Sequence, residues 1–161
     1  MKLQLILLDD LFYRGTGPEG SSSLSAYGRI YDTTETPLTL VASTPQNVSL
    51  GSAGPLKDIT AGGDNSLTIG DTGTYLVDYY FLGSSSANTE ITVELTQNTT
   101  PIGSSTITKN VTANAETDFA GSTIIELTAG DKIALTIEAT AGVTVTPSSG
   151  TSSFLNILRL S

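Results

Sequence analysis

The sequence has 161 residues and a mass of 16.7 kDa, and Asp and Glu outnumber Lys and Arg by 16 to 7. The net charge of -9 excludes nucleic acid and anionic membranes as expected partners, because few cations are available to neutralise phosphates. His and Cys are absent, which excludes Ser-His and Cys-His nucleophiles, imidazole or thiolate metal sites, and disulfides. The length suits one domain with an arm.

The first predicted elements are an apolar connector arm over residues 2–13 and a flexible, Gly- and Ser-rich linker over residues 14–23. The apolar members of the arm are Leu3, Leu5, Ile6, Leu7, Leu8, Leu11 and Phe12. They favour a strand with two apolar faces, a short helix being the alternative. Asp9 and Asp10 interrupt the run and no small-residue cleavage site follows, so we expect neither a signal peptide nor a membrane span.

An isolated apolar strand of this kind is unstable unless it pairs with other strands. We therefore expect the arm either to fold back on its own domain or to dock on another subunit by strand addition. A head-to-tail contact of the second kind would build a filament.

Residues 24–161 are predicted to form the domain, as a series of short strands separated by turn residues. The first strands are expected over residues 25–31, 38–42, 47–50 and 66–69. Residues 51–55 are predicted as a loop because they are rich in Gly, Ser and Pro, and residues 70–73 are predicted as a turn.

The strongest predicted strand covers residues 74–82. One of its faces carries Tyr75, Val77, Tyr79 and Phe81, and the other carries Leu76, Asp78, Tyr80 and Leu82. Both faces are largely apolar, so we expect one to enter the core and the other to contact a second subunit. Leu76, Tyr80 and Leu82 are the predicted interface residues.

Five further stretches are predicted to complete the sheets, over residues 90–97, 105–111, 117–127, 132–140 and 143–146, with a last strand over 154–160. The inward positions are expected to be Ile91, Val93, Leu95, Ile133, Leu135 and Ile137. About ten strands without an amphipathic helix predict an all-β sandwich.

Several short motifs, in this order and spacing, resemble a known family. They are Ala-Tyr-Gly-Arg-Ile-Tyr at 26–31, Gly-Pro-Leu at 54–56, Gly-Thr-Tyr-Leu-Val at 73–77, Leu-Thr-Ala-Gly-Asp-Lys-Ile at 127–133 and Leu-Asn-Ile-Leu-Arg-Leu-Ser at 155–161. Residues 24–161 are similar to the C-terminal domain of the Bacillus collagen-like exosporium glycoproteins (BclA-type). The resemblance implies a jelly roll of the tumour-necrosis-factor (TNF) and complement type, a tight homotrimer, and a location on the spore or cell surface.

The collagen-like stalk of that family is missing here apart from one triplet, and the apolar arm stands in its place. The resemblance therefore predicts a structural subunit of a spore appendage or other surface fibre, in which homotrimers are joined by their arms and attached through a spore-surface anchor protein. A fibre protein of a phage virion remains an alternative, as does a receptor- or carbohydrate-binding tip.

Carboxylates are the remaining acid and base groups. Glu116 and Asp118 have the spacing of a glycosidase pair but are expected to be solvated. Asp64, Asn65 and Asp71 could offer oxygens to Ca²⁺, although such residues are ordinary in turns. These weak signals lead us to predict no catalytic or metal site, no cofactor and no enzymatic activity.

Lysine and asparagine chemistry offers two further alternatives. Lys109 or Lys132 could form an isopeptide bond with an acidic neighbour if buried. The triplets at 47–49, 98–100 and 110–112 match the N-glycosylation pattern, which chance explains in a chain this rich in Asn, Ser and Thr.

Overall fold

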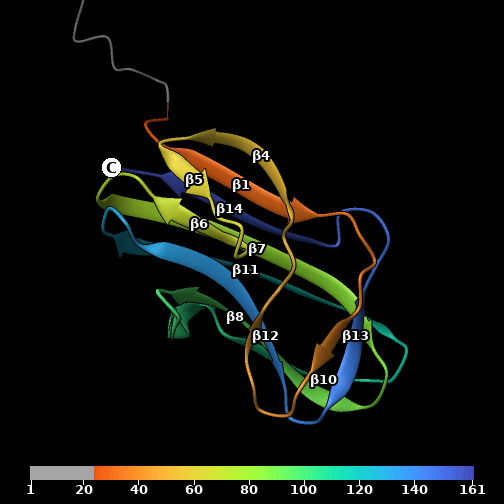
Figure 1. The fold of residues 1–161 in the computed structure, drawn as a ribbon. Helices are drawn as coiled ribbons and strands as arrows, with labels where there is room; N and C mark the ends of the chain where they lie inside the picture. The colour runs from red at the N-terminus through yellow and green to blue at the C-terminus, as the bar shows by residue number, and fades with distance from the viewer. Residues whose placement is uncertain (1–23) are drawn as a thin grey trace, which may run out of the picture.

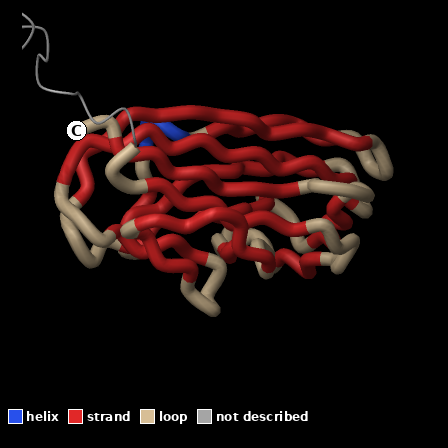
Figure 2. The backbone as a smooth tube through the Cα atoms, turned by 90° about the horizontal axis from the view of Figure 1, so that it is seen from above, coloured by secondary structure: helices blue, strands red, loops and turns tan. Residues whose placement is uncertain are grey.

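The computed structural model describes residues 24–161, which form two antiparallel β-sheets packed face to face (Figure 1). The predicted connector arm and linker lie outside the described residues, so the predictions for residues 2–23 stay predictions. Strands make up most of the described body, and the loops gather at its two ends (Figure 2).

Sheet A has the order β2-β13-β7-β14-β1-β4, and β11 pairs along the other side of β7. Its strands are β1 (Tyr27–Asp32), β2 (Leu38–Leu40), β4 (Ser52–Lys57), β7 (Gly73–Ser85), β11 (Glu116–Leu127), β13 (Val143–Pro147) and β14 (Ser153–Arg159). The long β7 forms the centre because β14 and β13 share one of its sides while β11 follows the other.

Sheet B has the order β10-β8-β12-β6-β5, with β3 paired to β12 and β9 to β8. Its strands are β3 (Gln46–Asn47), β5 (Ile59–Ala61), β6 (Ser66–Ile69), β8 (Thr89–Gln97), β9 (Thr100–Pro101), β10 (Ile107–Val111) and β12 (Lys132–Ala139). A short 3-10 turn, Gly103–Ser105, leads into β10.

The core lies between the sheets and is built from alternate residues of each strand. On β7 the side chains of Tyr75, Val77, Tyr79 and Phe81 are at most 2% exposed. On sheet B the predicted inward positions of β8 and β12 are buried as well, which confirms both patterns. Because side chains alternate across a strand, the next residues of β7 must face outward.

A close approach inside sheet A involves Tyr79 and Gly121. Tyr79 on β7 leans across Gly121 on β11, and its hydroxyl donates a hydrogen bond to the carbonyl of Ser105 in the 3-10 turn. A Cβ atom at position 121 would collide with the Tyr79 ring. Burial raises the pKa of the Tyr79 hydroxyl, which therefore acts as a fixed donor.

Several predictions of local structure were wrong. Residues 51–55 are not a loop, because β4 runs from Ser52 and pairs with β1. As β4 is an edge strand, Pro55 is tolerated although it has no N–H to donate. Strands β5 and β9 were not expected.

Further errors concern strand limits, and the strand expected over 38–42 ends at Leu40. Val48 and Leu50 are buried, but the strand ends at Asn47. The Val48 amide still bonds to the carbonyl of Leu135, whereas the Leu50 amide bonds to the side chain of Asn65. The strand expected at 105–111 starts only at Ile107, after the 3-10 turn.

The described chain begins and ends at the same end of the sandwich (Figures 1 and 2). The Arg159 amide donates to the carbonyl of Ala26 at 3.0 Å, and the Lys57 ammonium donates to the carbonyl of Leu24 at 3.0 Å. Leu24, the first described residue, therefore lies at the same end of the domain as the C-terminus.

Candidate functional site

The outer face of sheet A is the candidate subunit interface, and the pairing of β1, β14, β7 and β11 arranges its side chains in three rows. The apolar row contains Tyr27, Leu158, Leu76 and Ile124. The polar row contains Arg29, Asn156, Asp78 and Ser122. The aromatic row contains Tyr31, Phe154, Tyr80 and Ala120.

The aromatic row is held rigidly. The rings of Tyr80 and Phe154 stack with centroids 5.6 Å apart. The Arg29 guanidinium lies 5.1 Å from the centroid of Phe154 and 5.4 Å from that of Tyr31, which are cation–π distances. The row therefore presents a pre-organised surface, whose ordering cost is already met in the single chain.

The large side chains of this face remain partly exposed in the single chain. Ile124 is 62% exposed, and Tyr80, Phe154 and Leu158 are intermediate between buried and exposed. Contiguous apolar surfaces of this kind are typical of sites where proteins associate, which makes this face the candidate interface.

The structure places all three predicted interface residues on this face. Leu76 belongs to the apolar row and Tyr80 to the aromatic row, while Leu82 lies one step further along β7, opposite Asp118. That these residues contact another copy stays a prediction. The contributions of β1 and β14 to this face were not predicted, although side chains alternate between the two faces over residues 27–31 and 154–158.

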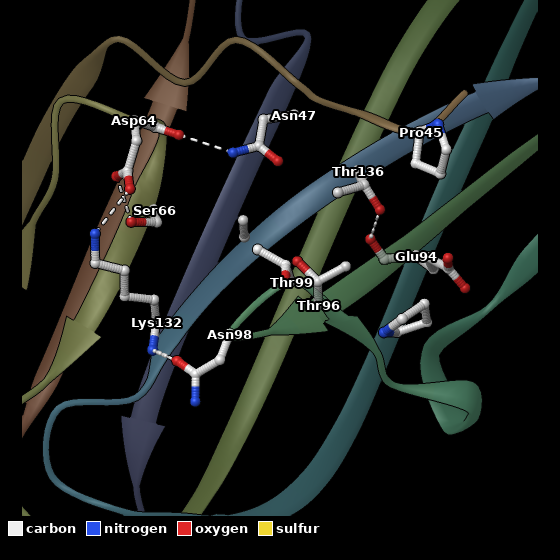
Figure 3. Close-up of a pocket in the computed structure, with 12 residues that line it drawn as sticks. Pro45, Asn47, Asp64, Ser66, Glu94, Thr96, Asn98, Thr99, Lys132 and Thr136 are labelled. Atoms are coloured by element: carbon white, nitrogen blue, oxygen red, sulfur yellow. Dashed lines mark hydrogen bonds and ion pairs between the residues drawn. The ribbon is translucent and has the colours of Figure 1, made fainter.

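The outer face of sheet B has a different chemistry and carries a groove of about 260 Å³ (Figure 3). A row of small residues crosses its floor from strand to strand: Ser66, Ala134, Thr96 and Pro101. Because these side chains are short, the longer neighbours Glu94 and Lys132 stand above them as walls.

Hydrogen bonds fix the walls of the groove. The Lys132 ammonium pairs with the Asp64 carboxylate at 2.9 Å, and Asn47 donates to the carbonyl of Asp64. The Ser66 hydroxyl and then Lys132 hold the pKa of Asp64 below its usual value, so this carboxylate stays charged. The groove can hydrogen-bond a small polyhydroxylated ligand, but none of its lining residues is aromatic.

The residues that could have offered oxygens to Ca²⁺ do not form one site. Asp71 lies 3.6 Å from the Arg159 guanidinium, whereas Asp64 pairs with Lys132. Among residues 24–161, no three His, Cys, Asp or Glu side chains gather in a group that could hold a metal ion.

The structure supports neither the glycosidase pair, Glu116 and Asp118, nor an isopeptide bond at Lys109 or Lys132. Glu116 accepts a hydrogen bond from Ser148, while Asp118 pairs with Lys109. The side chains of Lys109 and Lys132 are 41% and 54% exposed, so neither is buried as an isopeptide bond would need. Within the described part of the chain, no helix is long and apolar enough to cross a membrane.

Two solved structures share the fold. The Eiger TNF of S. frugiperda superposes with a TM-score of 0.64 at 16% identity, covering 86% of this chain and 94% of that chain. The globular domain of the zebrafish complement 1qA protein superposes with a TM-score of 0.59 at 13% identity, covering 85% of this chain and 98% of that one. These likenesses confirm the predicted jelly roll of TNF and complement type.

No curated protein matches the sequence. The family model of the BclA C-terminal domain matches residues 29–161. Since that match spans most of the chain and coincides with the jelly roll, the protein belongs to the BclA C-terminal domain family.

Proposed function

We propose that this protein is a non-enzymatic structural subunit of a surface fibre, and that it works as a homotrimer closed through the outer face of sheet A. The observation that carries the proposal is the pre-organised apolar and aromatic surface of that face. Family membership and the likeness to TNF and complement domains support a surface role and a non-catalytic one. A spore exosporium or appendage is the location we favour.

Energetics support association through this face. Complete burial of one large apolar side chain stabilises a complex by about 1.5–3 kcal/mol, and a partly buried one contributes a fraction of that. Tyr80, Phe154 and Leu158 are partly buried in the single chain, and three copies would each contribute them. Because stacking already holds the rings, less side-chain entropy is lost on association.

The position of the chain ends supports a fibre. Leu24 lies beside the C-terminus at one end of the sandwich, so the preceding residues of all three copies would leave a trimer at the same end. The ten linker residues 14–23 could reach about 35 Å when extended. The apolar arm over residues 2–13 would then pair with strands of the next trimer, and the last trimer would meet a spore-surface anchor protein.

Electron microscopy of two chains tests the fibre. The wild-type chain should form fibres, and a variant carrying Leu5→Asp and Leu7→Asp should give separate trimers, because charges cannot be buried in a strand contact. The matched control changes two linker residues, Ser21→Asp and Ser22→Asp, and should still form fibres. Fibres formed by the arm variant would contradict the role of the arm.

The groove on sheet B favours a second candidate function, binding of a carbohydrate. Thr96 and Ser66 on its floor, with Asn47 and Glu94 at its rim, offer both donors and acceptors to a neutral sugar. A glycan array would test it, with Thr96→Phe filling the groove and Thr92→Phe as a control outside it. Absence of binding, or equal binding by the two variants, would remove this candidate.

A further inference from the structure

The polar row is the unusual part of the outer face of sheet A, because it lies between two rows that are almost wholly apolar or aromatic. Arg29 has no ion-pair partner among residues 24–161, and Asp78 accepts a hydrogen bond only from Ser122 within the same range. The side-chain oxygen of Asn156 is buried without a partner in the described residues. Buried polar groups are normally paired, so the row is incomplete in the single chain.

The two charges of this row lie on opposite halves of the face. Arg29 lies on β1 and Asp78 on β7, with β14 and its Asn156 between them. Two strand spacings separate them, a distance of about 10 Å between backbones. A depression of about 510 Å³ lies over this part of the face, lined by both charged residues, Asn156, Tyr27 and Leu158. It leaves room for side chains from another molecule.

A ring of three copies imposes a rule on this face. Each contact in such a ring joins two different patches, here the β1–β14 half of one copy and the β7–β11 half of the next. With the ring axis parallel to the strands, every row keeps its height in all copies. Apolar row then meets apolar row, and aromatic row meets aromatic row.

We propose that Arg29 of one copy pairs with Asp78 of the next copy across each contact of the trimer, and that this polar layer sets the register of the subunits. The inference rests on the proposed homotrimer. A slip by one row would leave Arg29 against Leu76 or Tyr80, with a desolvated charge and no partner. The apolar rows thus supply affinity, while the polar row rejects misaligned trimers.

Charge reversal tests the pairing in the 161-residue chain, with native mass spectrometry reporting the smallest stable oligomer. Arg29→Asp places two aspartates at every contact and Asp78→Arg places two arginines, so each variant should raise the midpoint concentration for trimer assembly by at least about 30-fold. The double variant restores opposite charges and should recover trimers. Control charge changes on the outer face of sheet B, Thr108→Asp and Glu90→Arg, should assemble as the wild type does.

Co-expression of the two single variants separates pairing between chains from pairing within one chain. If pairs form between chains, a mixed ring has two matched contacts out of three, and the mixture should assemble at lower concentration than either variant alone. If the pair formed within a chain, mixing would rescue nothing, and the proposal would be wrong.

The outcomes distinguish this inference from the function on which it rests. A wild-type chain that stays monomeric overturns the proposed homotrimer itself. Wild-type trimers together with undisturbed single variants overturn only the Arg29–Asp78 pairing. Should a reversed variant fail to fold, as judged by circular dichroism, Arg29→Gln and Asp78→Asn replace them. A non-additive effect of these two changes on assembly supports the pair, and strict additivity overturns it.

Discussion

The outer faces of sheets A and B share antiparallel backbone geometry but carry opposite side-chain chemistry. Sheet A presents stacked rings and a guanidinium packed on them, as at Tyr80, Phe154 and Arg29. Sheet B presents hydroxyls that bond across strands, such as Thr92 to Thr108 at 2.9 Å. Hydroxyls on an exposed sheet form hydrogen bonds with water, whereas exposing aromatic rings to water is unfavourable. The difference supports the proposal that another copy covers the outer face of sheet A, while the outer face of sheet B stays in contact with water.

The largest expected effect comes from a charge placed on each face. Tyr80→Asp should dissociate the proposed trimer, because burying an unpaired carboxylate among aromatic rings costs several kcal/mol, on the order of what one subunit contact contributes. Thr68→Asp on β6 places the same group on the outer face of sheet B, beside Lys132, and should leave assembly unchanged. Sedimentation velocity compares the two. If the two variants had the same oligomeric state, the proposed difference between the two faces would be wrong.

A change on the inner side of sheet A separates folding from association. Gly121→Ala should lower the free energy of unfolding by about 1–3 kcal/mol, since the new methyl group displaces the buried Tyr79 ring. Gly103→Ala, where no atom lies within 4 Å of the added Cβ, is the matched control. Urea titration measures both. If Gly121→Ala were as stable as the control, the Tyr79 ring would not depend on the absence of a side chain at position 121.

The stability of sheet B is expected to depend on pH through Asp131, which lies in the turn that precedes β12. Asp131 accepts hydrogen bonds from the Thr128 amide and from the side chains of Asn98 and Gln97, and these hold its pKa below the usual value of 3.8. The charged form is therefore favoured in the folded state. Its contribution is complete above about pH 4 and is lost as the pH falls through the lowered pKa.

Asp131→Asn tests that dependence. The variant should be less stable than the wild type by about 1–2 kcal/mol at pH 7, because a charged acceptor is replaced by a neutral one. The difference should shrink as the pH falls below 3.8 and through the lowered pKa of Asp131, where the wild-type carboxylate becomes protonated. Thermal unfolding between pH 2 and 7 measures it, and a difference independent of pH would contradict the assignment.

The smallest effect is expected at the rim of the groove. Asn98 and Thr99 form the two-residue turn between β8 and β9 with φ values of 50° and 71°. A β-branched residue rarely adopts a positive φ, whereas Asn-Gly is favoured in such turns. Thr99→Gly should therefore stabilise the domain by up to about 1 kcal/mol. Loss of stability would show that the Thr99 side chain makes a contribution that outweighs its backbone strain.

Alternation of side chains made most of the fold predictable from sequence. In β7, β8 and β12 the apolar positions recur every second residue, and the structure buries those positions. Pro55 and its glycine neighbour concealed β4, because an edge strand tolerates residues that a central strand excludes. Val48 and Leu50 looked like part of a strand because apolar residues alternate there, but only the Val48 amide bonds to the backbone of β12, and the Leu50 amide bonds to the side chain of Asn65.

The candidate interface was only partly predictable. Leu76, Tyr80 and Leu82 lie in one strand, so their shared face follows from local periodicity. The rows depend on which strands are neighbours, and β1 and β14 lie far from β7 in sequence. Arg29, Asn156 and Asp78 lie in one row because of the register of three strands, which no single segment of the sequence reveals.

The most direct test of the account is the mass of the smallest stable species of the wild-type chain at micromolar concentration, by native mass spectrometry. Burial of the outer face of sheet A between copies predicts a species of three chains of 16.7 kDa each, with no stable single chain. A folded, soluble single chain as the dominant species would contradict it.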